Sequence, residues 1–481
     1  MSSTPPARWS HIRLALKRAY GPSQRPRRRC LTTLAIESSC DDTAVAVLTR
    51  RPSCPSSRSH HGSSQLLHPS EDSTLASLLF NQRISSDNRA FKGVHPAVAV
   101  VGHATSLAKL VRRAINHLPK PASNQQLTRK LCYADDGSPR LVPDFVSVTR
   151  GPGMTTNLAI GMDTAKGLSV AWGVPFIGVH HMQAHALTPQ LVSALNMPPF
   201  ALPPRPHFPF LSLLVSGGHT QLVLSTNLTT HRILATTLDS AIGNVLDQTA
   251  RLILPASEIA SSPDVMYGRL LESFAFPPED PDPYGFFKPY ASRGEEMVAK
   301  PTGYGWTIPL PFRQSREVAF SFSSIYSTVH RITTSNRSMP LAERRALARH
   351  TLASAFQHLI GRICLAIEAD PATLLPALRN SLVVAGGVAS NKFLMHVLRE
   401  TLKVRVPQLE GKLEVVSPPV ELCTDNAAMI AWAGMEMFEN GWHTDLGATP
   451  VPKWPMDPAH GSGLLGVDGW LRREGSDQAA Q

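Results

Sequence analysis

The feature that most constrains the fold of this chain is a pair of similar segments far apart in the sequence. Each consists of an apolar run, a polar turn and a second apolar run. The first spans residues 34–48 and turns at Glu37–Thr43, and the second spans residues 210–224 and turns at Ser216–Thr220. Such segments predict β-hairpins. Two hairpins roughly 175 residues apart predict a duplicated α/β architecture with a ligand cleft between its halves.

The segment between the hairpins predicts a parallel arrangement. Phe145–Thr149 has the pattern of a strand, Gly151–Gly153 forms a turn, and Leu158–Trp172 has the pattern of a helix with small residues on one face. Val174–Val179 returns as a strand. A strand, crossover helix and strand in this order favour two parallel strands in one sheet.

Helices and strands also alternate in the last third of the chain. The expected elements are a long helix over Ala342–Glu368, a strand at Leu382–Ala385 followed by Gly386 and Gly387, a helix near Asn391–Lys403, a strand at Val415–Ser417 and a helix over Thr424–Phe438.

A chain of 481 residues exceeds the usual size of a single core, so we expect two lobes. We place them at 31–205 and 206–440. Segments rich in Ser, Pro and charge predict surface insertions at 50–74, 119–143 and 277–307, and an irregular tail is expected at 441–481.

The net charge of +11 is concentrated at the N-terminus, where residues 1–30 hold eight basic and no acidic residues. The remainder therefore carries 11 − 8 = +3, which by itself gives weak support for a nucleic-acid partner. Trp9–Tyr20 alternates apolar and basic residues at helical spacing, as organellar presequences do. We therefore interpret residues 1–30 as a presequence; the alternative is a basic tail that binds RNA.

The cysteine pattern and the hydropathy exclude several classes of protein. The six cysteines form no CxxC pair, so neither a disulfide framework nor a zinc ribbon is expected. No apolar run reaches the roughly 18 to 20 residues that a membrane-spanning helix needs. We expect a protein without a membrane segment in a reducing compartment.

Two histidines suggest metal chemistry. His181 and His185 lie four residues apart after a predicted strand, so on a helical turn they share a face and can hold one divalent ion; packing is the alternative. Met182 occupies the position where an HExxH peptidase needs its glutamate. Asp425 offers an oxygen ligand, although Thr424 or Asp425 can also serve as the N-cap of the following helix.

Three glycine-containing loops follow apolar strands, at Gly151–Gly153, Ser216–Gly218 and Gly386–Gly387. Backbone N–H groups in such loops can bind phosphate, although tight turns are the commoner reason for glycine. Several turn carboxylates can bind ribose or orient a nucleophile, with capping as the simpler role: Asp41, Asp42, Asp239 and Asp247.

Taken together, these segments resemble the tRNA threonylcarbamoyladenosine synthase family, an offshoot of the actin-like and sugar-kinase ATPase fold. The matching stretches are LAIESSCDDTAVAV (34–47), VTRGPGMTTNLAIGMDTAKGLSVAWGVPFIGVHHMQAHAL (148–187), FPFLSLLVSGGHTQLV (208–223), TLDSAIGNVLDQTARL (237–252), FSFSS (320–324), LVVAGGVASNKFL (382–394) and CTDNAAMIAWAG (423–434).

The resemblance assigns roles to particular residues. It implies one divalent ion per subunit, zinc, iron or magnesium, bound by His181, His185 and Asp425, with Asp41 beside the reacting centre. It also implies a substrate site that contains Leu214, Val215, Ser216, Gly217, Gly218, Asp247, Gly268, Ser390, Asn391 and Thr424.

The resemblance further implies a reaction and its partners. Threonylcarbamoyl-AMP, supplied by a separate synthase, donates its acyl group to N6 of adenosine 37 in tRNAs that read codons beginning with adenine. The opening ESSCDDT resembles the bacterial and mitochondrial branch, which favours a homodimer in the mitochondrial matrix acting on mitochondrial tRNA.

The chain departs from the family pattern at several positions: Asn244 for Glu, Gln248 for Lys, Tyr326 for Lys, Met266-Tyr267 for Pro-Gly, and Ala97 and Val101 for Glu and Arg. Three other functions stay open at this point. They are an actin-like kinase or ATPase, a metallopeptidase, and a non-catalytic scaffold that keeps the fold.

Overall fold

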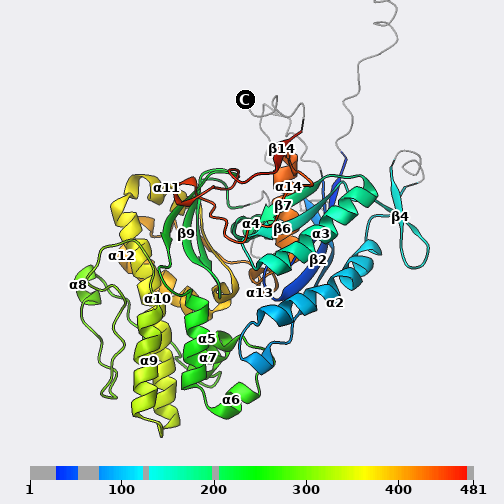
Figure 1. Cartoon of the computed structure of the whole chain (residues 1–481). Coiled ribbons are helices and arrows are strands. Elements are labelled where there is room, and N and C mark those ends of the chain that lie inside the picture. The colour runs from blue at the N-terminus through cyan, green and yellow to red at the C-terminus, as the bar shows by residue number, and fades with distance from the viewer. Residues whose placement is uncertain (1–28, 52–74, 123–128, 198–204, 474–481) are drawn as a thin grey trace, which may run out of the picture.

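The computed structural model describes residues 29–51, 75–122, 129–197 and 205–473 (Figure 1). Most of the expected presequence and most of the expected insertion at 50–74 lie outside the described residues. No helix in the described ranges is long and apolar enough to span a bilayer.

Both predicted hairpins are confirmed. Strand β1 (Leu31–Glu37) pairs antiparallel with β2 (Asp42–Arg50), and β8 (Phe210–Val215) pairs antiparallel with β9 (Thr220–Ser225). In each case the polar residues form the turn and the apolar runs form buried strands. The expected strand, helix and strand between the hairpins are also present, and the two strands are parallel.

The two large sheets share the same internal strand order. The larger sheet runs β14-β13-β7-β6-β1-β2-β3, and the smaller runs β10-β9-β8-β11-β12. In both, three consecutive strands form an antiparallel meander, a later strand pairs in parallel with the first of them, and a further strand pairs in parallel with that one. The remaining strands of these units are β3 (Ala76–Ser85), β6 (Phe145–Gly151), β7 (Phe176–His180), β10 (His231–Thr236), β11 (Leu382–Ala385) and β12 (Val415–Val416). The architecture is therefore duplicated.

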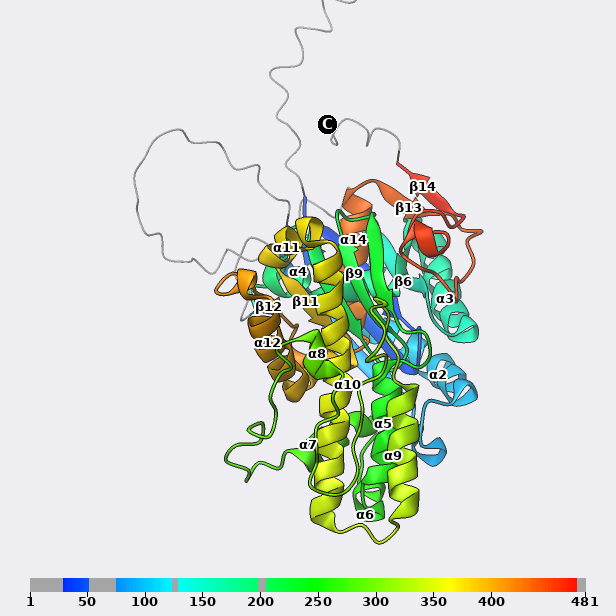
Figure 2. The same ribbon diagram turned by 90° about the vertical axis from the view of Figure 1, so that its left-hand side faces the viewer.

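Helices cover both sheets and fill the space between them (Figures 1 and 2). Helices α2 (Pro96–Ile115) and α3 (Thr155–Trp172) pack on the outer face of the larger sheet. Helices α4 (His181–Ala194) and α14 (Ala427–Glu439) lie in the core shared by the two sheets. Helix α10 (Leu341–Ala369) belongs to the core on the other face of the smaller sheet.

The alternation of side chains along the strands creates these layers. In β1, Leu34 and Ile36 contact the outer helices, whereas Ala35 faces the shared core. In β8, Leu214 faces the shared core and Leu211 the opposite one. Because α4 lies between two sheets, every residue from His181 to Ala194 is buried, and the two histidines are held by packing on all sides.

The segment after Trp442 differs from the expected irregular tail. Strand β13 (Trp442–Thr444) pairs with β7, and β14 (Trp470–Arg472) pairs with β13. Trp454 and Asp457 between them are 3% and 4% exposed. Three-residue strands carry no readable periodicity, so only the long-range pairing reveals that this segment extends the larger sheet.

Two expected insertions contain ordered structure. Within 119–143, β4 (Leu131–Tyr133) and β5 (Pro139–Leu141) form a small antiparallel sheet. Within 277–307, Glu296 is buried and forms an ion pair with Arg405 at 2.6 Å, which ties this segment to the core.

The remaining helices are α5 (Ile242–Ile253), α6 (Ala256–Ala260), α7 (Tyr267–Ala275), α8 (Arg293–Glu296), α9 (Ser323–Ser335), α11 (Pro371–Asn380), α12 (Lys392–Arg405), α13 (Val420–Cys423) and the 3-10 turns η1 (Arg89–Phe91), η2 (Gly387–Ser390), η3 (Pro407–Leu409) and η4 (Pro458–His460).

Candidate metal and nucleotide site

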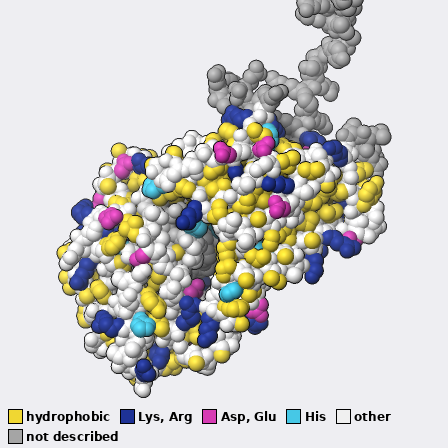
Figure 3. Space-filling model, viewed as in Figure 1, with side chains coloured by type: hydrophobic (Ala, Val, Ile, Leu, Met, Phe, Trp, Pro, Cys, Tyr) yellow, Lys and Arg dark blue, Asp and Glu magenta, His cyan; other side chains and the backbone are white. Residues whose placement is uncertain are grey.

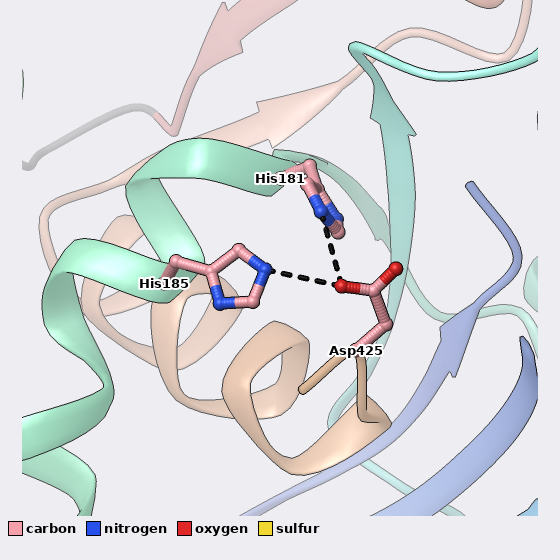
Figure 4. A group of neighbouring side chains, drawn as sticks. All are labelled: His181, His185 and Asp425. Atoms are coloured by element: carbon pink, nitrogen blue, oxygen red, sulfur yellow. Dashed lines mark hydrogen bonds and ion pairs between the residues drawn. The ribbon is translucent and has the colours of Figure 1, made fainter. Parts of the chain in front are cut away.

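Two histidines and one aspartate converge at the start of α4 (Figure 4). His180 ends β7 and caps α4 by accepting a hydrogen bond from the Gln183 backbone N–H, so the helix begins at His181. His181 and His185 are one turn apart. Their Nε2 atoms lie 3.5 and 3.2 Å from Oδ1 of Asp425.

The loop before α14 presents Asp425 to the histidines. The alternative role considered for Thr424 or Asp425, the N-cap of this helix, is wrong, because Asn426 occupies the N-cap and accepts from the Met429 N–H at 3.0 Å. The Asn426 amide also donates to the Thr424 carbonyl at 2.8 Å. The Asp425 carboxylate is therefore free to face α4, while the Arg83 guanidinium holds Thr424 Oγ1 at 2.5 Å.

A fourth residue, Glu37 at the end of β1, was not among the predicted site residues. Its Oε2 lies 3.3 Å from His181 Nδ1 and accepts from Thr149 Oγ1 at 2.5 Å, and its Oε1 accepts from the Ser39 N–H at 2.6 Å. The side chain is fully buried. An acidic residue at the end of an otherwise apolar strand is the sequence signal that could have identified it.

The charges in this cluster depend on one another. Burial opposes charge on His181, but Asp425 and Glu37 raise its pKa to about 10. Burial works against ionised Asp425, yet the two histidines hold its pKa well below its usual range. The pKa of Glu37 is lowered by His181 despite burial, and burial lowers the pKa of His185. Two carboxylates facing one charged imidazole leave excess negative charge, which favours a cation.

The first hairpin turn places Asp41 near this cluster. Its Oδ2 accepts from Asn88 Nδ2 at 2.9 Å, and burial together with repulsion from Asp425 raises its pKa. The turn also packs against the loop at Gly151–Gly153, since a Cβ on Gly153 would lie 2.8 Å from the Ser39 carbonyl oxygen. Close packing of the chain, rather than a ligand, therefore explains Gly153.

The second hairpin turn faces the metal-ligand candidates from the smaller sheet. Leu214 and Val215 are buried in β8, so of the five predicted residues here only the turn residues Ser216, Gly217 and Gly218 are accessible. A Cβ on either glycine would meet no atom within 4 Å. The neighbouring His219, not predicted as a site residue, has its pKa lowered to about 4 by burial and by His181 and His185.

Two further glycines allow backbone segments to gather at this turn. A Cβ on Gly243, at the start of α5, would lie 2.7 Å from the Ser216 carbonyl oxygen. Gly386 has a φ of +99°, and a Cβ there would lie 2.4 Å from the Val215 carbonyl oxygen. The second and third predicted glycine loops are therefore neighbours, and they meet the beginning of α5.

The other predicted nucleotide residues gather around α7. Asp247 Oδ1 accepts from the Gly268 N–H at 2.6 Å, and burial raises the pKa of Asp247 to about 6. Glu272 on α7 accepts from the Lys392 N–H at 2.7 Å at the start of α12, where Asn391 is the N-cap. The structure thus brings these segments together. Ser390 lies beside Asn391 and donates to the Gly387 carbonyl at 2.7 Å.

Comparison with known proteins identifies the family. Residues 142–432 match the family model described as tRNA N6-adenosine threonylcarbamoyltransferase. The chain is 33% identical over 93% of its length, and 90% of the relative's, to the mitochondrial tRNA N6-adenosine threonylcarbamoyltransferase of Schizosaccharomyces pombe. The chain belongs to the tRNA N6-adenosine threonylcarbamoyltransferase family. It is accordingly a transferase that acts on tRNA.

A more distant relative carries the same name. The tRNA N6-adenosine threonylcarbamoyltransferase of Brucella ovis is 30% identical over 91% of this chain and 99% of its own length. Among solved structures, HypF from T. kodakarensis aligns with 85% of this chain and 48% of its own, at 11% identity and a TM-score of 0.41.

The metallopeptidase interpretation loses its remaining support, because Met182 in α4 is a buried apolar side chain.

Two of the departures from the family pattern form a hydrogen-bonded row on α5. Asn244 Nδ2 donates to Ser240 Oγ at 2.8 Å, and Gln248 Nε2 donates to Asn244 Oδ1 at 3.3 Å. Where the family pattern has Glu and Lys, this enzyme therefore has two neutral side chains that remain in contact. At positions 244 and 248, α5 therefore carries no charge, and the two side chains are still held by hydrogen bonds.

Proposed function

We propose that this enzyme transfers the threonylcarbamoyl group from threonylcarbamoyl-AMP to N6 of adenosine 37 in mitochondrial tRNAs that read codons beginning with adenine. One divalent ion, held by His181, His185 and Asp425, takes part. The observation that supports the proposal most directly is the convergence of these three side chains from segments that lie 240 residues apart in the sequence.

The three side chains fit a metal ion. Their ligand atoms all lie within 4.8 Å of one another. Nitrogen and oxygen ligands about 2.0–2.1 Å from a tetrahedral ion are roughly 3.3 Å apart, close to the 3.2 and 3.5 Å between Asp425 and the two imidazoles. Three protein ligands leave a position open for substrate, as in catalytic sites. Two imidazoles and one carboxylate suit zinc or iron better than magnesium.

When bound, the ion supplies Lewis-acid polarisation of the acyl donor and charge stabilisation for the leaving phosphate. The residues of this chain supply the positioning. In the turn Ser216–Gly218, the Ser216 N–H donates to the His219 carbonyl and the Gly218 N–H to Ser216 Oγ, so the Gly217 N–H is the group that can bind a phosphate. Asp247, already fixed by Gly268, has its second oxygen available for ribose hydroxyls, and Asp41 lies beside the ligands. We place the substrate in a cleft between two lobes, where Figure 3 shows the surface hollowed.

Substitution of the ligands tests the metal site. His181→Ala or His185→Ala should abolish bound metal and transfer activity and leave unfolding cooperative, because each removes a ligand. His231→Gln is the matched control: this buried imidazole in β10 contacts the Ser225 hydroxyl and the Leu228 carbonyl and does not face Asp425. The control should retain metal. A ligand variant with full metal content and activity would overturn the assignment.

Nucleoside analysis tests the reaction. After loss of the gene, mass spectrometry of mitochondrial tRNA should find adenosine where threonylcarbamoyladenosine is normally present, and cytosolic tRNA should be unchanged. Restoring the wild-type enzyme should restore the modification, whereas His185→Ala should not. Unchanged modification of mitochondrial tRNA would reject the proposed substrate.

We also propose a mitochondrial matrix location, with residues 1–30 as a cleaved presequence. The supporting observations are the eight basic residues in this segment and the mitochondrial name of the S. pombe relative. Deleting residues 1–30 should abolish import and leave activity in vitro nearly unchanged. Import of the truncated protein would reject the presequence, and loss of tRNA affinity would identify an RNA-binding arm.

We propose a homodimer that forms through α2 and α3. Val101 on α2 and Val170 on α3 are 61% and 64% exposed, and hydrophobic side chains gather over these helices (Figure 3). Val101→Glu should therefore convert the dimer to a monomer in light-scattering measurements. Val298→Glu, at a position that is 67% exposed outside these helices, should leave the dimer intact.

A further inference from the structure

We propose that Glu37 is a positioning residue for the metal site: it binds His181 Nδ1–H and thereby makes Nε2 the ring nitrogen that is directed at the metal and that gives up its proton when the metal binds. This inference rests on the proposed metal site and adds a residue outside the three ligands. A ligand histidine generally donates its second N–H to a carboxylate, carbonyl or water, which fixes the tautomer and strengthens the ligand.

The contacts of Glu37 fit this role. Its Oε2 lies 3.3 Å from His181 Nδ1, whereas His181 Nε2 points to Asp425 on the opposite side of the ring. The carboxylate is fully buried, and in the described part of the chain no Lys or Arg forms an ion pair with it. A buried carboxylate without a cationic partner is costly. The His181 Nδ1–H, on a ring that is either protonated or bound to the ion, is therefore the partner that this carboxylate faces.

The two ligand histidines differ in the groups that surround their Nδ1 atoms. His181 Nδ1 has Glu37, and the Ser39 hydroxyl also lies 3.3 Å from it. His185 Nδ1 is buried, and no hydrogen-bond partner for it occurs within the described ranges. Of these two histidines, only His181 has a carboxylate within hydrogen-bond distance of its Nδ1 atom. Glu37 therefore fixes the ring orientation of His181 and the position of its Nδ1 proton.

Glu37→Gln is the most informative substitution. The Ser39 N–H donates to Oε1, so the amide oxygen of a glutamine must take that place and its NH2 group must face His181. An NH2 group donates, so it favours the imidazole tautomer with an unprotonated Nδ1 and a protonated Nε2. That proton occupies the nitrogen that should bind the metal. The change keeps the side-chain size and reverses the hydrogen bonds with His181 Nδ1 and with Thr149 Oγ1.

The experiment measures zinc affinity by competition with a chromophoric chelator in the wild-type enzyme and in three variants. Glu37→Gln should weaken zinc binding about 10- to 100-fold. Glu296→Gln is the control for loss of a buried carboxylate, since Glu296 is 4% exposed and pairs with Arg405 outside the site. Its zinc affinity should stay within about threefold of wild type. Ser39→Ala tests the hydroxyl and should also have a small effect.

The possible outcomes are distinguishable. If wild type binds no zinc, the proposed metal site fails. If wild type binds zinc and Glu37→Gln binds it equally well, or if only Ser39→Ala weakens binding, the inference about Glu37 fails and the metal site stands. Should Glu37→Gln not fold, nitrogen NMR of wild type with labelled histidine decides. A protonated Nδ1 and a metal-bound Nε2 in His181 are expected, and the reverse would overturn the proposal.

Discussion

Asp42, at the start of β2, is a buried carboxylate whose charge the fold disfavours. It is 5% exposed, and burial raises its pKa to about 7 despite the Arg83 guanidinium at 3.4 Å and the Ser85 hydroxyl. Because the folded-state pKa exceeds the unfolded value near 3.9, ionisation destabilises the folded state progressively between about pH 4 and pH 7. Above pH 7 the full effect is up to about 4 kcal/mol.

We therefore expect Asp42→Asn to become more stable than wild type as the pH rises from 5 to 8, in urea unfolding of the metal-free enzyme. Asp87→Asn is the control. Asp87 is exposed, and its hydrogen bonds with Arg89 lower its pKa to about 2, so it does not titrate in this range. A stability difference for Asp42→Asn that is the same at both pH values would show that ionisation is not the cause.

Asp247, unlike Asp42, is proposed to contact the substrate by accepting hydrogen bonds from ribose hydroxyls. Asp247→Asn should keep the contact with Gly268, because an amide oxygen also accepts, but it loses the charge that strengthens hydrogen bonds from ribose hydroxyls. We expect adenylate binding to weaken by roughly 1.5 to 3 kcal/mol, with metal content unchanged. Calorimetric titration with a non-hydrolysable adenylate analogue measures the change. Equal affinity in the two proteins would leave Asp247 only as the acceptor for Gly268.

At the scale of an element, the N-terminus of α14 connects helix stability with the proposed metal site. Asn426→Ala removes two hydrogen bonds that hold the loop around Asp425. The Met429 N–H loses its acceptor, and the Thr424 carbonyl loses its amide donor. We expect a loss of about 1 to 2 kcal/mol in stability and a weaker zinc affinity, because Asp425 is no longer held toward α4.

The cap of α11 provides the control for this prediction. Asp370 accepts from the Thr373 N–H at 3.2 Å, and no residue of this helix belongs to the site. Asp370→Ala should lower the unfolding midpoint in urea to a similar extent and leave zinc affinity unchanged. If both variants lose metal equally, the effect comes from global destabilisation and not from the Asp425 loop.

At the scale of the whole molecule, the C-terminal segment joins the two sheets. The Trp454 carbonyl accepts from His180 Nε2 at 2.7 Å beside β7, and Asp457 Oδ2 accepts from the Ile233 N–H at 2.7 Å in β10 of the smaller sheet. The segment therefore contributes to the stability of the entire fold, although its sequence predicts an irregular tail.

Trp454→Ala should lower the free energy of unfolding by about 3 to 5 kcal/mol, as removal of a buried aromatic ring does. Leu471→Ala in β14 is the control. Because the Leu471 side chain is 41% exposed, the loss in the free energy of unfolding should be small. Chemical denaturation measures both. Similar small losses would mean that the segment packs loosely and carries little of the stability.

The sequence by itself determined the features that depend on neighbours along the chain. Apolar runs on either side of a polar turn identified both hairpins, and the spacing of His181 and His185 placed them on one helical face, because both patterns depend only on residues close together in the sequence. Together with the family motifs, this was enough to anticipate the duplicated fold and to nominate Asp425 as the third ligand.

Only the tertiary structure decided which distant groups meet. Asp425 reaches His185 across 240 residues because α14 packs against α4 in the core between the sheets. Glu37 and His219 join the site from two different sheets, and Asn426 takes the helix cap that leaves Asp425 free. These contacts arise from packing between elements, and no local period in the sequence encodes them.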